Sequence, residues 1–335
     1  MSAVATALDD VAAVAQRLAV LLAAGIAPER AWGFVEARWA ASGADDGEAA
    51  PDAAGVGVGD YLACAARAAA RADDVAVAIR AECAAAPRFG LAHQRAVAWG
   101  LFAATWAVAV RSGAPLAATL QGFASGIRHA AALHRELEVA FSGPRSTARL
   151  VGALPLVALG FGLLMGFDTV HALTATPIGW GCLAGGLGLM IASRRWSARL
   201  LAAAEPSELA PGLEPELVAV AMGSGASVGR ARGLVASALD DFAPFVRELG
   251  GAADTRAVDA VVALAESAGV PTAGLLRAEA ERRRADADAA GRAAAASVAV
   301  RLTVPLAVCV LPAFMLLGVV PVLVALFAGS GIGFG

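Results

Sequence analysis

Three long stretches of this chain contain no charged residue and are rich in apolar side chains. Residues 150–167 and 173–193 follow each other closely, with a short polar segment between them, and residues 302–328 lie near the C-terminus. About 20 apolar residues are enough for a helix to cross a bilayer. The pattern therefore predicts a transmembrane hairpin over 150–193 and a C-terminal transmembrane helix over 302–328, which is interrupted by three prolines.

The remaining sequence mixes apolar and charged residues and is interrupted by glycine and proline, which is typical of a series of helices exposed to water on one face. Residues 1–149 predict a first helical block with a flexible Gly-, Ala- and Asp-rich loop at 42–59, and residues 194–301 predict a second block with a linker at 205–215. Arginines precede the hairpin at Arg145 and Arg149 and follow it at 194, 195 and 199. Positive residues favour the cytoplasmic side, so both blocks and the N-terminus are expected in the cytoplasm and the C-terminus outside. The predicted fold class is an all-α membrane protein of the plasma membrane.

A glycine followed by a proline two or three residues later recurs along the predicted helices. Glycine just past a helix end and proline at the start of the next helix mark a turn between helices. This pattern predicts turns at Gly25 and Pro28, Gly113 and Pro115, and Gly269 and Pro271, and a weaker version at Gly225 has Val228 in place of the proline.

The second and third of these turns share a longer spacing. Gly113 lies 15 positions before Arg128, and Gly269 lies 15 positions before Arg284. Each of these arginines is in turn followed by one of the apolar stretches. The repeat predicts that a helical unit joined to a membrane span has been duplicated.

Three further helices follow from the pattern. Residues 61–86 predict one Ala- and Arg-rich helix, and residues 116–139 predict a helix with an apolar face in steps of three and four. Residues 96–110 are apolar between Arg95 and Arg111, but 15 residues are too few to span a bilayer. We therefore expect 96–110 to be a core helix, and its entry into the membrane would require a different topology.

Composition narrows the possible functions. The chain is 59% hydrophobic, and its 26 basic residues are all arginine. Without lysine it cannot bind nucleotide through a P-loop, and its net charge of −3 gives no basic surface for nucleic acid. The four cysteines lack metal-ligand spacing and predict small buried side chains. No cofactor, metal ion or catalytic residue is predicted.

Two local patterns suggest chemistry without establishing it. Gly57–Asp60 matches the GxGD pattern of membrane aspartyl proteases, whose second aspartate could only be Asp168 near a span end. Asp60 is better explained as a cap of the following helix. His129 and His134 are five residues apart and do not share a helix face, which argues against a metal pair.

The last helix before the C-terminal span is densely charged. Its spacing predicts opposite-charge pairs four residues apart, namely Glu279–Arg283, Arg282–Asp286 and Arg284–Asp288. The run Arg282, Arg283 and Arg284 is also the candidate contact for lipid headgroups or an acidic partner.

This order of elements resembles the type II secretion system F family, the inner-membrane platform proteins of type II secretion, type IV pili and tight-adherence (Tad/Flp) pili. Residues 18–28 are similar to the opening helix and turn of that family and residues 265–271 to its mid-domain turn. Residues 311–323, LPAFMLLGVVPVL, resemble the terminal span of Tad-type members. The copies are unequal, since Gly25 and Gly113 are 88 residues apart but Gly225 and Gly269 only 44.

The resemblance implies a non-enzymatic platform that couples a cytoplasmic secretion ATPase to pilin or pseudopilin subunits. A related platform subunit or a second copy of the chain would complete it, in contact with membrane lipid and without nucleic acid. The predicted spans contain no charge, which argues against an ion-coupled carrier. Two alternatives remain open, a permease-like transporter subunit and an intramembrane aspartyl peptidase.

Overall fold

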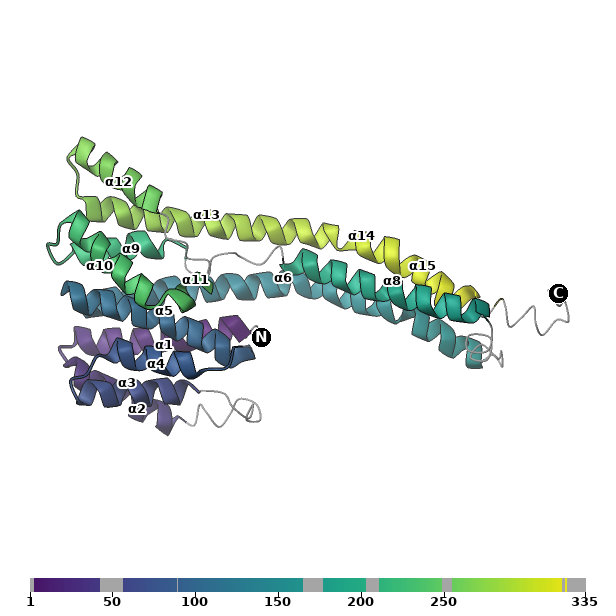
Figure 1. Ribbon diagram of the computed structural model, residues 1–335, viewed down its shortest axis with the longest axis horizontal. Helices are drawn as coiled ribbons and strands as arrows, with labels where there is room; N and C mark the ends of the chain where they lie inside the picture. The colour runs from purple at the N-terminus through teal and green to yellow at the C-terminus, as the bar shows by residue number, and fades with distance from the viewer. Residues whose placement is uncertain are drawn as a thin grey trace. The chain divides into compact units, whose positions relative to one another are not determined.

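The computed structural model describes residues 3–42, 57–88, 90–164, 177–202, 211–248, 255–320 and 323. All the secondary structure of these residues is helical (Figure 1), which confirms the all-α class. Among them, no helix combines the length and the apolar character that crossing a membrane requires. Parts of the predicted spans, residues 165–176, 321–322 and 324–328, lie outside the described residues.

The chain forms two compact units, each made from two separate stretches of sequence. Unit 1 consists of residues 1–136 and 206–289, and unit 2 of residues 137–205 and 290–335. Both stretches predicted as helical blocks therefore contribute to unit 1.

The helices of unit 1 come from both stretches. The first stretch supplies α1 (Ala3–Ala23), α2 (Pro28–Ala41), α3 (Val58–Ala70), α4 (Val75–Ala85), α5 (Gly90–Ser112) and the start of α6 (Leu116–Leu164). The second supplies α9 (Leu213–Met222), α10 (Val228–Asp241), α11 (Ala243–Glu248), α12 (Thr255–Ala268) and most of α13 (Thr272–Arg301).

Helix α5 is the centre of the unit 1 core. Its residues from Ala96 to Ala109 are all buried, which confirms the expected core helix. Trp99 stacks on Tyr61 of α3 with ring centroids 5.0 Å apart, and Phe102 meets Trp32 of α2 edge-on at 5.8 Å. These large aromatic contacts fix α2 and α3 against α5.

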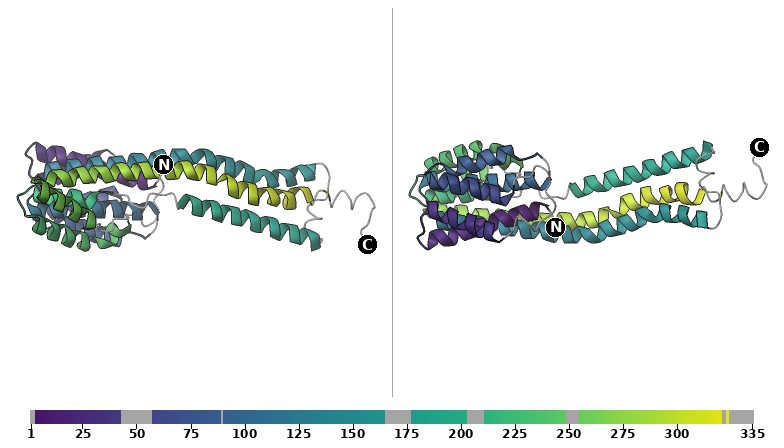
Figure 2. Two further views of the ribbon diagram at one scale, coloured as in Figure 1. Left: turned by 90° about the horizontal axis from the view of Figure 1, so that it is seen from above. Right: turned by 90° about the horizontal axis from the view of Figure 1, so that it is seen from below.

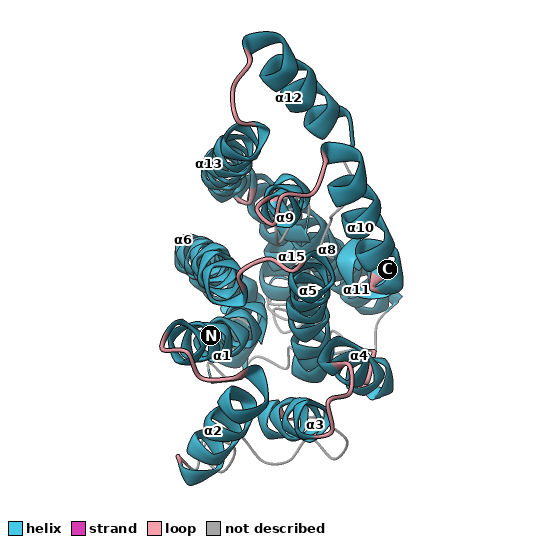
Figure 3. Ribbon diagram, turned by 90° about the vertical axis from the view of Figure 1, so that its left-hand side faces the viewer, coloured by secondary structure: helices cyan, strands magenta, loops and turns pink. Residues whose placement is uncertain are grey.

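The predicted turns between helices are confirmed, including the weaker one at Gly225. Gly25, Gly113, Gly225 and Gly269 all have positive φ, between 66° and 87°, which is a conformation that glycine adopts without steric cost. Each ends one helix, and the next begins within four residues. Together with the α3–α4 turn, they lie at the same end of unit 1 (Figures 1 and 3).

Three of these turns also share a hydrogen bond. The residue after each glycine donates its backbone N–H to a carbonyl five residues earlier: Ile26 to Leu21 at 3.1 Å, Ala114 to Ala109 at 3.0 Å and Val270 to Ala265 at 3.2 Å. This is the Schellman arrangement, which satisfies carbonyls that the helix end would leave free.

The single helix predicted over residues 61–86 is wrong. It is divided into α3 and α4 because Ala72 has a φ of 56° and the Asp74 side chain caps α4, accepting from the backbone N–H of Ala76 at 2.9 Å and Val77 at 3.3 Å. The predicted capping by Asp60 is confirmed with a shifted boundary, since α3 begins at Val58 and Asp60 accepts from the Gly57 N–H at 2.8 Å.

Helix α6 differs in length from the prediction. It does not end at residue 139 but continues to Leu164 as one helix of 49 residues. Gly143 and Pro144 are adjacent in the sequence, so this segment lacks the spaced Gly and Pro of the turns that end α1 and α5.

In unit 2, α8 (Pro177–Ala202) runs alongside the C-terminal helical segments (Figure 2). These are α14 (Thr303–Pro305), the π-helix η1 (Leu306–Val310), α15 (Leu311–Phe314) and the π-helix η2 (Met315–Val319). A Cβ added to Gly186 would lie 2.4 Å from Leu317 Cγ, so glycine permits this close approach. Gly185 also lies at this contact, where an added Cβ would be 3.3 Å from Leu316 Cδ1, whereas a Cβ added to Gly181 would meet no atom within 4 Å.

Candidate functional site

Two arginines at equivalent positions of the repeat each bind the first helix of their own half. In the first half, the Arg128 guanidinium of α6 donates to Gln16 Oε1 of α1 at 3.0 Å. In the second half, Arg284 of α13 forms an ion pair with Glu216 of α9.

The acceptors also occupy equivalent positions. Gln16 lies 9 residues before Gly25, and Glu216 lies 9 residues before Gly225. Both the donors and the acceptors therefore stand at matching distances from the glycine turns. The duplication predicted from sequence thus extends to a three-dimensional contact within unit 1.

Helix α6 leaves room for the second of these contacts. A Cβ at Gly122 would lie 3.0 Å from Glu216 Oε1, and a Cβ at Gly126 would lie 3.5 Å from Arg284 Nη2. The two glycines are one helical turn apart on the same face of α6. The ion pair therefore packs against a part of α6 that has no side chain at these two positions, called the glycine strip below. About a quarter of each side chain is exposed to solvent, 24% for Arg284 and 21% for Glu216. This burial lowers the pKa of Arg284.

The predicted pairing of Arg284 with Asp288 is wrong. Arg284 turns toward α9, and Asp288 instead binds His129 of α6. Arg284 and Asp288 each face a neighbouring helix, so each pairs with a residue of that helix and not with the other along α13. His129 therefore takes part in a polar contact between α6 and α13, and the described residues contain no cluster of three metal-binding side chains.

These polar groups surround a small cavity between α5, α6, α9 and α13. Its volume is about 50 Å³, and it is lined by apolar side chains together with Glu216, Arg284, Asp288, His129 and His134. A cavity of this size has space for a few water molecules and not for an organic ligand. Burial lowers the pKa of His134.

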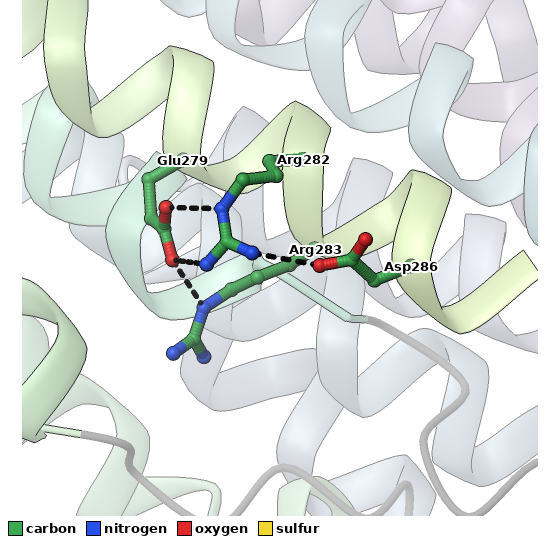
Figure 4. Close-up of polar contacts among 4 residues, drawn as sticks. All are labelled: Glu279, Arg282, Arg283 and Asp286. Atoms are coloured by element: carbon green, nitrogen blue, oxygen red, sulfur yellow. Dashed lines mark hydrogen bonds and ion pairs between the residues drawn. The ribbon is translucent and has the colours of Figure 1, made fainter. Parts of the chain in front are cut away.

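The other two arginines of the predicted contact run, Arg282 and Arg283, pair with acidic residues of α13 itself (Figure 4). Arg282 donates to both Glu279 carboxylate oxygens at 2.8 and 2.9 Å and to Asp286 at 2.8 Å. Arg283 donates to Glu279 at 3.1 Å. The pairs Glu279–Arg283 and Arg282–Asp286 are thus confirmed.

The contacts between Glu279 and the two arginines shift the pKa values of the groups involved. Hydrogen bonds from Arg282, and then from Arg283, lower the pKa of Glu279, and the same carboxylate raises the pKa of Arg282. The Arg282 side chain remains 62% exposed, so it is the member of the run that a partner or a lipid headgroup could reach.

Other predicted residues fall elsewhere. Cys64, Cys83, Cys182 and Cys309 are buried and free, as the sequence indicated. Asp60 is occupied in capping α3, and Asp168 lies outside the described residues.

Comparison with known proteins finds no family model that matches the chain and no match among curated proteins or solved structures. The resemblance to secretion platform proteins therefore remains a prediction.

Sequence reasoning missed Gln16 and Glu216. Their spacing of 9 residues from Gly25 and Gly225 was a detectable signal, because both glycines had been identified as turns. The missing step was to extend the repeat toward the N-terminus of each half.

Proposed function

We propose that this chain is a plasma-membrane platform protein of a type II secretion, type IV pilus or Tad pilus assembly system. It couples a cytoplasmic secretion ATPase to the assembly or secretion of pilin subunits. The observation that carries the proposal is the duplicated helical unit, with Arg128 on Gln16 and Arg284 on Glu216 at matching distances from the turns.

The distribution of side chains in unit 2 supports its placement in the membrane. Large apolar side chains are exposed at the end of α13 and along the C-terminal segments, at Val300, Val304, Val308, Leu311 and Met315. The α8 contact is made instead through small residues, at Gly185 and Gly186. Small residues between helices and large apolar residues outside are typical of helices that pack in lipid.

A second apolar row supports the same placement. Trp180, Leu187 and Ile191 of α8 are exposed, and their spacing of seven and four residues puts them on one face of the helix. Apolar surface of this extent is costly in water, so it favours contact with lipid or with another apolar helix.

Two helices are suited to couple the units. Residues 116–136 of α6 and 272–289 of α13 belong to unit 1, and both helices continue into unit 2 without a turn. In the proposed mechanism, α6 and α13 would link unit 1, which would bind the ATPase, to unit 2, which would bind pilin. The chain would obtain its energy from a separate ATPase, because it has no P-loop lysine.

Affinity purification of the tagged full chain from its native membrane, in mild detergent and followed by mass spectrometry, tests this function. We expect a secretion ATPase and small pilin-like proteins to be recovered with it. A matched purification of an unrelated tagged membrane protein controls for abundant contaminants. Recovery of a transporter ATPase with a solute-binding protein would contradict the proposal and favour the permease-like alternative.

A further inference from the structure

A groove of about 590 Å³ lies at the end of unit 1 where the first three turns meet. It is formed by the α1–α2, α3–α4 and α5–α6 turns, whose ends all lie at that face (Figure 3). This volume is within the range of sites that bind a ligand or a few side chains. It is much larger than the cavity between α6 and α13 and is separate from it.

The charged side chains that line the groove are all acidic. They are Glu29 in the first turn of α2, and Asp73 and Asp74 in the α3–α4 turn. Asp74 caps α4, but the carboxylates of Glu29 and Asp73 form no hydrogen bond or ion pair with a described residue. Asp73 and Asp74 also line a neighbouring groove, whose other charged residues are Arg67 and Arg71; neither arginine lines the groove described here.

The floor of the groove is apolar. Trp106 and Ala114 are buried beneath it, Leu116 is partly buried, and Val110 is 54% exposed although it belongs to the core helix α5. Ala72, which has the strained φ of 56°, also lines the groove. Strain of this kind is found preferentially where a binding surface is held in shape.

We propose that this groove binds a segment of the secretion ATPase that presents an arginine or lysine beside a large apolar side chain. The basic group would face Glu29 and Asp73, and the apolar side chain would cover Val110 and Leu116. An acidic rim repels phosphate, so anionic lipid headgroups and nucleic acid are disfavoured as occupants. The choice of the ATPase as partner rests on the proposed function, and the location and the charge of the surface come from the groove itself.

Direct binding of the purified full chain in detergent to the purified secretion ATPase tests this inference. We expect the double variant Glu29→Arg, Asp73→Arg to bind about tenfold more weakly than wild type or worse, because two attractive charges become repulsive. Val110→Ser should weaken binding by about threefold, because it removes apolar contact area from the same groove.

Matched controls distinguish the groove from a general charge effect. Asp240→Arg with Glu266→Arg makes the same change in net charge at two exposed positions outside the groove, each in the last turn of a helix where arginine is tolerated. This variant should bind within about twofold of wild type. The neutral variant Glu29→Gln, Asp73→Asn avoids a positive charge at a helix start, and its binding should weaken less and depend less on salt.

The outcomes separate the two proposals. If wild type binds the ATPase and all three groove variants bind equally well with native helix content, the groove assignment is overturned and the platform function stands. If wild type does not bind the purified ATPase at all, the motor-coupling function fails, and the groove assignment fails with it.

Discussion

The guanidinium of Arg284 in α13 forms an ion pair with the carboxylate of Glu216 in α9, across the glycine strip of α6. The corresponding contact in the first half of the chain joins Arg128 to Gln16. An amide has thus taken the place of a carboxylate at one of two equivalent positions. The two halves keep the geometry of the contact and differ in its charge.

Replacing Glu216 tests how much the charge contributes. Glu216→Gln reproduces the first-half contact and should lower the free energy of unfolding by about 1 kcal/mol, because a hydrogen bond to Arg284 remains. Glu216→Ala leaves the largely buried guanidinium of Arg284 without its carboxylate and should cost about 2 kcal/mol, less than for a fully buried pair. Thermal unfolding of the detergent-purified variants measures both. Equal losses would mean that the amide cannot replace the carboxylate.

The reverse change in the first half provides a control. Gln16→Glu places a carboxylate opposite Arg128, and this contact is exposed. We expect a gain below about 1 kcal/mol, as is typical of surface ion pairs. A large loss would show that the two contacts are not equivalent.

The glycine turns should not tolerate a side chain. Gly113→Ala and Gly269→Ala should each cost about 1 kcal/mol, because φ is 70° and 66° at these positions. Gly33→Ala is the matched control inside α2, where a Cβ meets no atom within 4 Å. It should be neutral or stabilising by up to about 1 kcal/mol. Equal melting temperatures for all three variants would contradict the assigned turns.

Packing in unit 2 depends on Gly186. Gly186→Ala places a Cβ where Leu317 now lies and should cost about 1–3 kcal/mol through overpacking. Gly188→Ala is two residues away on the same helix, and its Cβ meets no atom within 4 Å. Resistance to protease in native membranes should therefore fall for Gly186→Ala and stay unchanged for Gly188→Ala. The opposite order would contradict the α8 packing.

The buried His134 predicts a loss of stability in acid. Burial lowers its pKa in the folded chain below the ordinary value of 6.5, so the unfolded chain binds the proton more readily. Stability contributed by neutral His134 is therefore present above pH 6.5 and is lost as the pH falls below it. Melting temperatures at pH 7.5 and 5.5 should differ more for wild type than for His134→Gln. An equal or larger difference in the variant would contradict this assignment.

The glycine turns between helices could be predicted from the sequence, because each depends on the backbone conformation of a single glycine. Gly25, Gly113 and Gly269 are required by positive φ, so the turns could be placed from sequence. The same rules failed at residues 61–86, because the Asp74 cap is a short polar signal within an Ala-rich stretch that otherwise favours helix.

The candidate site was less accessible to such reasoning. Arg282 and Arg283 pair within their own helix, as spacing predicts, but Arg284 and Asp288 find partners on other helices. Helical periodicity shows which residues can meet along one helix, and it carries no information about which helix lies opposite. The groove at the turns could not be predicted for the same reason, because Glu29 and Asp73 are far apart in the sequence and come together only when the helices pack.

The most direct test of the platform function is to delete this chain and count the fibres on cells by electron microscopy, with prepilin cleavage followed by immunoblot. The account predicts that fibres, or the secreted cargo, are lost while cleaved pilin remains in the membrane, and that the wild-type chain restores assembly. Normal fibres in the deletion strain would contradict it.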